Sequence, residues 1–265
     1  MTRLQWIDPT EYDFSCMLLF EGFQIRYLLG LTDARYRQDL GIALRYNPAV
    51  SWYFVHKCPE KAELVEALVQ AAPETDALTV RQIECRILGC VEDFVIYTTP
   101  ERMAANCPFI YGWDKTRLLE LAEFRGKTVL DVGSGSGRLA FAAAEQAAEV
   151  YASEPVETLR EFLRNEARRK GVGNLRVADG MCNDLPYPDS TFDIVMSGHV
   201  VGDNLDAELA ELERVAKPGG WLLDCPGDQM EETGVSALTD RGWEDLAYVG
   251  SFGAVVHRHR KRVCK

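Results

Sequence analysis

The chain has 265 residues, of which 47% are hydrophobic and 26% charged, and its formal net charge is -12. This composition is typical of a soluble, well-packed protein, long enough for one large α/β domain and a smaller one. The acidity argues against nucleic acid as a partner, because a surface that binds phosphates needs clustered basic residues. No stretch reaches the ~20 consecutive apolar residues needed to cross a bilayer, so no membrane partner is expected.

The cysteines indicate the compartment. All eight stand outside any C-x-x-C pair, and the N-terminal region has Asp8, Glu11 and Asp13 where a targeting signal would be basic. We therefore expect a cytoplasmic protein whose cysteines are reduced and mostly serve as small buried side chains. No metal site is predicted.

The first part of the chain, residues 1–110, predicts a mainly helical domain. Thr79 and Gln82 have the spacing of a capping box, and apolar residues then recur at three- and four-residue steps as far as Val95. This pattern predicts one helix from Thr79 to Val95. Another helix is expected to begin at Pro59.

From about Gly126 the pattern changes to alternating strands and helices, which predicts a second domain, residues 111–265. Such alternation is typical of a parallel sheet covered by helices on both faces, with ligands bound beyond the carboxyl ends of the strands. The expected strands are 127–132, 149–153, 174–178, 192–197 and 220–225, with a closing pair at 243–252 and 254–263. The expected helices are 115–124, 137–148, 155–170 and 206–216.

A glycine loop follows the first of these strands. Gly133, Gly135 and Gly137 stand at alternate positions, where missing Cβ atoms let the backbone approach a ligand closely. Such a loop alone would also fit a dinucleotide. Arg138, however, stands where the dinucleotide fingerprint needs a small residue, and Asp131 suits an amine-bearing ligand better than a pyrophosphate. A nicotinamide-dependent oxidoreductase is therefore disfavoured.

Residues 127–227 resemble the catalytic core of class I S-adenosyl-L-methionine (SAM)-dependent methyltransferases, in particular the type 11 group. Five motifs in the family's order carry the resemblance: the glycine loop, Glu154, Asp179-Gly180, the LPYPDSTFDIV run from Leu185, and the RVAKPGG run from Arg214. The resemblance implies a Rossmann-like, mostly parallel seven-stranded sheet with helices on both faces. It also implies SAM as cofactor, S-adenosyl-L-homocysteine as product and a methyltransferase activity of class EC 2.1.1.-.

The cofactor contacts expected from the resemblance also have physical reasons. The carboxylate of Glu154 could accept both ribose hydroxyls, and that of Asp179 an adenine amino group. The competing interpretations are a solvated acid at the head of a helix for Glu154 and a turn former for Asp179. The expected cofactor-binding residues are Tyr111, Trp113, Asp131, Gly133, Ser134, Gly135, Gly137, Glu154, Asp179, Gly180, Met181 and Ser197.

Aromatic residues ahead of the first strand form a further candidate contact. Tyr111 and Trp113 would pack on the methionine portion of SAM or on its cationic sulfur. Ordinary core packing between the two domains is the competing interpretation.

His199, after the fourth strand, is the candidate catalytic residue. The transfer itself needs little chemistry from the protein, because the sulfonium is already activated and in-line positioning supplies most of the rate. A base is needed only when the acceptor loses a proton, and His199 could serve as that base or orient the acceptor. A histidine bonded within the fold or facing solvent is the competing interpretation. Asp193 and the Lys217–Gly220 turn are expected to support the fold.

The function predicted is a SAM-dependent methyltransferase acting on a small molecule, with the N-terminal helices capping the site and selecting the acceptor. One alternative is a protein methyltransferase that docks its partner through the N-terminal domain. Another is a SAM-binding protein without transferase activity. The basic run His257–Arg262 is expected to lie on the last strand with its side chains mostly in solvent. No residue points to one acceptor or oligomeric state.

Overall fold

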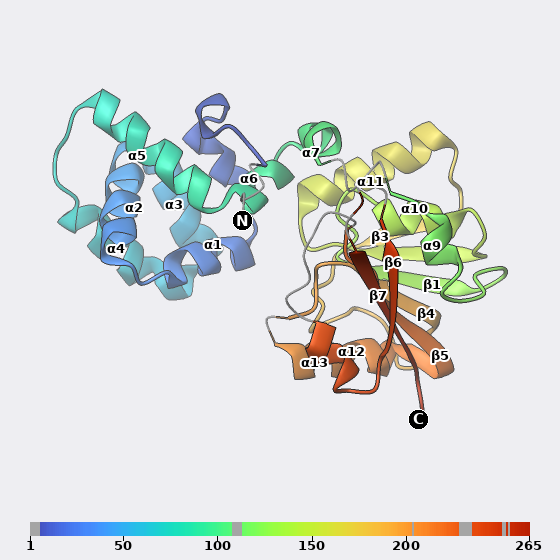
Figure 1. Ribbon diagram of the computed structural model, residues 1–265. Coiled ribbons are helices and arrows are strands. Elements are labelled where there is room, and N and C mark those ends of the chain that lie inside the picture. The colour runs from blue at the N-terminus through green and yellow to red at the C-terminus, as the bar shows by residue number, and fades with distance from the viewer. Residues whose placement is uncertain (1–5, 108–112, 203, 228–234, 251–252, 254) are drawn as a thin grey trace. The chain divides into compact units, whose positions relative to one another are not determined.

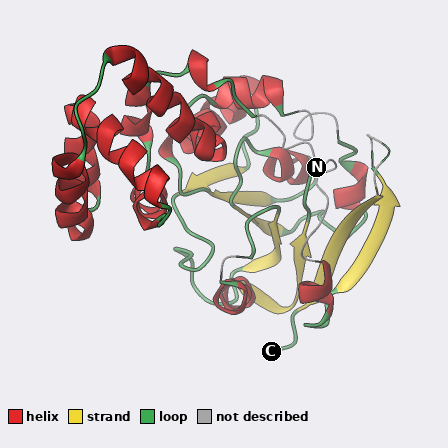
Figure 2. Cartoon of the chain, turned by 60° about the vertical axis from the view of Figure 1, so that its left-hand side comes forward, coloured by secondary structure: helices red, strands yellow, loops and turns green. Residues whose placement is uncertain are grey.

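The computed structural model describes residues 6–107, 113–202, 204–227, 235–250, 253 and 255–265 (Figure 1). Contacts between residues divide the chain into two compact units, Met1–Met103 and Ala104–Lys265. Every strand in the described part of the chain belongs to the second unit (Figure 2). Each unit is therefore described by itself.

The first unit is built from helices, as the sequence predicts. Its core holds fully buried aromatic side chains, among them Phe14, Phe20 and Phe54. No helix in the described ranges is long and apolar enough to cross a membrane. The helices are η1 (Pro9–Glu11), η2 (Phe14–Leu19), α1 (Gly22–Gly30), α2 (Ala34–Tyr46), α3 (Pro48–Lys57), η3 (Pro59–Lys61), α4 (Ala62–Ala71), α5 (Ala77–Cys90), α6 (Glu92–Tyr97) and α7 (Pro100–Asn106), the last of which runs across the boundary.

The expected helix from Thr79 to Val95 is wrong at both its start and its continuity. Asp76 caps α5, and its carboxylate accepts the Thr79 N–H at 3.0 Å. Val91 leaves the helical region with φ -131° and ψ 39°, so that α6 begins anew after it. The apolar pattern continues across this break because α5 and α6 each bury an apolar face. Periodicity alone does not reveal a break of one residue. The helix expected at Pro59 is confirmed; its first turn is η3.

The second unit contains the predicted seven-stranded, mostly parallel sheet. Its strand order is β3-β2-β1-β4-β5-β7-β6, in which β7 runs antiparallel to both of its neighbours. The strands are β1 (Thr128–Val132), β2 (Glu149–Ser153), β3 (Leu175–Ala178), β4 (Phe192–Ser197), β5 (Ala216–Asp224), β6 (Glu244–Val249) and β7 (Val255–Arg262). The helices are α9 (Thr116–Leu119), α10 (Arg138–Ala144), α11 (Glu157–Lys170), α12 (Leu205–Val215) and α13 (Val235–Thr239), of which α13 was not expected.

Helices cover both faces of this sheet, which explains the continuous hydrophobic runs of its strands. Val129 belongs to a buried cluster with Leu139 of α10 and Leu163 of α11. Leu130, the next residue of β1, belongs to the opposite cluster with Leu212 of α12. Neighbouring residues of one strand thus fill two separate cores.

The basic tail contradicts the expectation that its side chains meet solvent. Arg258 and His259 are buried. The Arg258 guanidinium donates to Pro226 O, and the His259 ring lies between the carboxylates of Asp224, at 3.5 Å, and Asp245, at 3.7 Å. The reason is the strand order: β7 lies inside the sheet, and β6, which precedes it in the chain, forms the edge.

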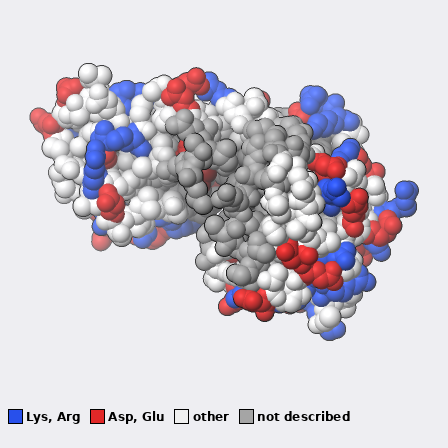
Figure 3. Space-filling view, viewed as in Figure 1, with Lys and Arg blue, Asp and Glu red and all other residues white. Residues whose placement is uncertain are grey.

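Surface charges are mixed over both units. In the view of Figure 3, Lys and Arg side chains lie beside Asp and Glu side chains on each unit. Many of them form exposed ion pairs, such as Arg169–Glu166 and Lys115–Glu145, both at 2.6 Å. Pairs of this kind contribute little to stability, about 0–1 kcal/mol each.

Candidate functional site

The candidate site lies at the carboxyl edge of the parallel strands. From β1 the sheet order runs through β2 to β3 on one side and through β4 to β5 on the other, which makes β1 the neighbour of the switch point. The register aligns the strand ends: Val132 lies opposite both Ser153 and Ser197, and Ser153 lies opposite Ala178. The residues that follow these ends are therefore brought to one edge, as predicted from their order in the chain.

The glycine loop, residues 133–137, fits tightly between β1 and α10. Gly133 and Gly137 have φ of +64° and +93°, the left-handed region that favours glycine. A Cβ on Gly133 would lie 2.3 Å from Val200 Cγ2, and one on Gly137 would lie 2.5 Å from Phe141 Cε2. Both glycines are thus required by the backbone angle and by the space around them.

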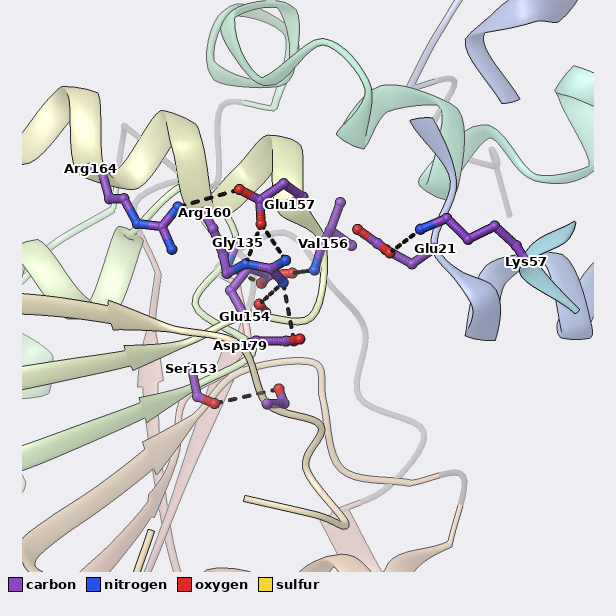
Figure 4. A network of polar contacts seen from close by, with 11 residues as sticks. Glu21, Lys57, Gly135, Ser153, Glu154, Val156, Glu157, Arg160, Arg164 and Asp179 are labelled. Carbon is purple, nitrogen blue, oxygen red and sulfur yellow. Dashed lines mark hydrogen bonds and ion pairs between the residues drawn. The ribbon is translucent and has the colours of Figure 1, made fainter. Parts of the chain in front are cut away.

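Glu154 joins the end of β2 to the glycine loop. The residue is 4% exposed; its Oε2 accepts the Gly135 N–H at 2.8 Å and its Oε1 accepts the Val156 N–H at 2.9 Å (Figure 4). Burial raises the pKa of this carboxyl to about 7, although both N–H groups favour the charged form. Each oxygen retains a further lone pair, so the group is able to accept from a ligand as well.

Asp131 is the second buried carboxyl at this edge. It is 1% exposed, and its Oδ2 has no hydrogen-bond partner among the described residues. Burial raises its pKa to about 7, against the hydroxyl of Ser134 and the charge of Arg138, which lower it. A buried acceptor without a donor is costly in a folded protein, and it is suited to a ligand that brings a donor.

The segment after β3 holds the predicted Asp179, Gly180 and Met181. The Asp179 side chain is 73% exposed, and its Oδ1 accepts from Arg160 at 3.1 Å. Gly180 passes so close to β2 that an added Cβ would lie 2.3 Å from Ser153 Oγ. Met181 presents part of its surface to solvent. Arg160 was not singled out in the sequence, because no pattern connects it with Asp179, 19 residues further along.

The residues after β4 meet the segment that follows β5. Ser197 is fully buried, and its Oγ donates to Asp224 Oδ1 at 3.3 Å. His199 has φ +64°, and its Nε2 accepts the N–H of Gly227. Desolvation and the positive charge of Arg138 lower the pKa of His199 to about 4, although the residue as a whole is exposed. The imidazole is therefore neutral at neutral pH.

Trp113 lies beside the end of the glycine loop, and Tyr111 lies outside the described residues. The Arg138 guanidinium stacks 4.9 Å from the Trp113 ring centroid and donates to Cys225 O. Trp113 also lines a cavity of about 510 Å³ together with residues 136–138. Glu154, Asp179 and His199 are not part of that cavity, which borders the candidate site from the side of α10.

Asp193 and Lys217, which were expected to support the fold rather than the chemistry, lie away from the candidate site. Asp193 Oδ2 accepts the Thr128 N–H at 2.9 Å, and its Oδ1 accepts from Lys217 at 3.0 Å. These contacts tie the starts of β1, β4 and β5 together at the edge opposite the candidate site. The expected turn at Lys217–Gly220 is instead part of β5, where the pairing with β4 is irregular.

Comparisons with known proteins show which proteins this chain resembles. Residues 130–224 match the type 11 methyltransferase family model, described as "Methyltransferase domain". The chain is 32% identical over 118 residues to the uncharacterized methyltransferase YcgJ of Bacillus subtilis, covering 43% of this chain and 47% of that protein. It is 32% identical over 116 residues to a demethylmenaquinone methyltransferase of Geobacillus kaustophilus, covering 42% and 50%. The chain thus spans about half the length of these relatives.

The fold is also that of a solved structure. A SAM-dependent methyltransferase from Aquifex aeolicus matches with a TM-score of 0.52 and 20% sequence identity, covering 63% of this chain and 98% of the other. The predicted class I methyltransferase fold is confirmed.

Proposed function

We propose that the protein transfers a methyl group from SAM to a small-molecule acceptor, because residues 130–224 match a family model described as a methyltransferase domain and the sheet has the class I methyltransferase fold. S-adenosyl-L-homocysteine is the second product, and the activity belongs to EC 2.1.1.-. The observation that carries the proposal is the pair of buried carboxyls, Asp131 and Glu154, on either side of the glycine loop. We also propose that the protein acts in the cytoplasm.

The donor groups of SAM fit the acceptors available at this edge. Oδ2 of Asp131, which has no hydrogen-bond partner among the residues that the structure describes, would take the ammonium group, while Glu154 would take the ribose hydroxyls. Asp179 would take the adenine amino group, and Gly133, Gly135 and Gly137 leave room for the close approach of the ligand. SAM supplies an activated methyl group when bound. The remaining proposed contacts are Tyr111, Trp113, Ser134, Gly180, Met181 and Ser197.

A small-molecule acceptor is supported by the Geobacillus kaustophilus relative, which is named for the methylation of demethylmenaquinone. We further propose that the N-terminal helices select the acceptor, because binding specificity usually resides outside the conserved scaffold of a fold. The family model matches none of the first 129 residues.

The test is direct. Calorimetry with SAM and S-adenosyl-L-homocysteine, followed by assay of S-adenosyl-L-homocysteine formation on a broad panel of small acceptors, examines binding and turnover separately. Absence of binding would refute the proposal. Binding without turnover on small molecules, but with turnover on protein substrates, would point to the protein methyltransferase alternative, and binding without any turnover to a SAM-binding protein.

The affinity for SAM is expected to fall as the pH is lowered from 7 to 5. The pKa values of Asp131 and Glu154 are both raised to about 7 by burial, so both groups take up protons over this range. Binding needs the charged forms and must release those protons, which weakens the affinity by up to about tenfold per pH unit for each coupled group. The ammonium of SAM stays protonated in this range, because its pKa is about 8.

Calorimetry in two buffers of different ionisation enthalpy measures the proton release. Asp131→Asn is the matched control, since it is expected to bind weakly but to lose its own share of the pH dependence. An affinity for SAM that stays constant from pH 5 to 7 would contradict the assignment of both carboxyls.

We retain His199 as the proposed base or acceptor-orienting residue, acting in its neutral form. His199→Ala is expected to lower kcat by about 100-fold, the lower end of what a positioned base contributes, with little change in SAM affinity. His199→Asn is the informative control. Asn tolerates φ +64° and keeps a polar side chain at this position, but it does not take up a proton.

The two variants separate the possible roles of His199. Low turnover in both variants supports proton transfer, whereas recovery in His199→Asn assigns the residue to orientation. Turnover of His199→Ala within a few fold of the wild type would reject the catalytic role.

A further inference from the structure

A buried arginine connects the two acids proposed for the nucleoside. Arg160 of α11 is only 7% exposed. Its Nη1 donates to the backbone oxygen of Glu154 at 2.7 Å and to Asp179 Oδ1 at 3.1 Å, and its Nε donates to Glu157 Oε2 at 2.8 Å (Figure 4). One guanidinium thus joins the end of β2, the first turn of α11 and the segment after β3.

We propose that Arg160 is a positioning residue for the nucleoside end of SAM: it fixes the Asp179 carboxylate and the end of β2 that carries Glu154 before the ligand arrives. The proposal rests on the proposed function, since it requires that SAM binds at this edge. Arg160 itself is turned toward the protein and is not proposed to touch the ligand.

The exposure of Asp179 is the first reason. A carboxylate that is 73% exposed would otherwise sample several rotamers, and a ligand would have to immobilise it on binding. The bond from Arg160 occupies Oδ1 and leaves Oδ2 for a donor. A planar guanidinium suits this task because its fixed donors reach several acceptors at once, which the ammonium of lysine does with less direction.

Charge is the second reason. The negative charge of Asp179 raises the pKa of Glu154, and the positive charge of Arg160 lowers it. Arg160 therefore offsets the repulsion between the two acids and favours the charged form of Glu154, which accepts hydroxyl donors best. The ribose and adenine of SAM are uncharged, so the ligand brings no cation of its own to this end of the site.

The chain offers a matched control on the same helix. Arg164 lies one turn beyond Arg160, its side chain is 44% exposed, and it pairs with Glu157 at 3.4 Å. None of its described contacts is with Glu154 or Asp179. Comparing Arg160→Met with Arg164→Met therefore separates the contacts with the two acids from the general effect of removing an arginine from α11.

The experiment measures SAM and adenosine binding by calorimetry. Arg160→Met is expected to weaken both by the same factor, about tenfold or more, because the loss of charge-assisted hydrogen bonds affects only the nucleoside end. Arg164→Met is expected to stay within about twofold, and kcat at saturating SAM is expected to change little in either variant. Loss of SAM affinity without loss of adenosine affinity in Arg160→Met would overturn the proposal. It would also be overturned if Arg160→Met and Arg164→Met bound SAM with equal affinity.

Arg160→Lys provides a second route if the methionine variant folds poorly. Arg160→Lys is expected to lose part of the affinity in the wild-type background and a smaller part when Asp179 is already replaced by asparagine, because only the contact with the end of β2 then remains to be lost. Additive losses would show that Arg160 does not act through Asp179.

Hydrogen exchange of residues 179–181 in the ligand-free protein tests the proposal without any cofactor. These amides are expected to exchange faster in Arg160→Met and at the wild-type rate in Arg164→Met. If the wild type bound neither SAM nor adenosine, the proposed function would fail, while faster exchange in Arg160→Met would still show that Arg160 orders residues 179–181. Unchanged exchange would overturn it.

Discussion

Replacing Glu154 with glutamine is expected to weaken SAM binding by about 100-fold or more, the largest single loss at the proposed site. Hydrogen bonds to a charged group contribute roughly 1.5–3 kcal/mol each, and two ribose hydroxyls are involved. The loss is therefore about 3–6 kcal/mol, or two to four orders of magnitude in the dissociation constant. Glutamine also turns an amide donor toward one of the two N–H groups that Glu154 accepts, those of Gly135 and Val156.

Calorimetry measures this loss, with thermal unfolding to separate it from a loss of stability. Glu149→Gln is the matched control, because Glu149 stands at the opposite end of the same strand and pairs with Arg176 at 3.3 Å. The control is expected to bind SAM like the wild type. If Glu154→Gln bound SAM within about fivefold of the wild type, the ribose assignment would be wrong, since even one charged hydrogen bond is worth more than that.

The sequence predicts much of the site because its parts are local. The glycine loop, Glu154 and Asp179 each follow directly after a strand, and parallel strands bring their carboxyl ends to one edge whatever the details of packing. The burial of β1 on both faces is visible in the run of apolar residues around Leu130. Positions that follow from chain order and strand pattern were therefore predictable.

Other contacts at the candidate site join residues that are distant in the chain, and no sequence pattern indicates them. Arg138 reaches Cys225 O, 87 residues away, and Arg160 of α11 reaches Asp179, 19 residues away. Both arginines resemble ordinary surface residues of amphipathic helices in the sequence. The buried tail shows the same limit, because a basic run on the last strand is exposed at an edge and buried inside the sheet. The position of the strand in the sheet decides whether these side chains are buried, and the sequence of the tail does not reveal that position.

The second large effect is expected for Gly137→Ala. A left-handed backbone costs a residue with a Cβ roughly 1–2 kcal/mol, and overpacking a buried contact costs about 1–3 kcal/mol more. Both apply here, because φ is +93° and the new Cβ would lie 2.5 Å from Phe141 Cε2 and 2.7 Å from Leu163 Cδ2. The free energy of unfolding is thus expected to fall by about 2–5 kcal/mol, as measured by urea denaturation.

Two other glycines separate the causes of this loss. Gly126 also has a left-handed backbone, with φ +72°, but an added Cβ there meets nothing within 4 Å, so Gly126→Ala is expected to lose only about 1–2 kcal/mol. Gly173 has neither constraint, and Gly173→Ala is expected to be nearly neutral. The Gly137 N–H closes the loop onto Ser134 O at 2.8 Å, so Gly137→Ala should also weaken SAM binding by about tenfold or more, as the loss of a preorganised contact does. Equal losses of stability in Gly137→Ala and Gly126→Ala would show that the contact with α10 and α11 is soft, and that the loop requires glycine for its backbone angle alone.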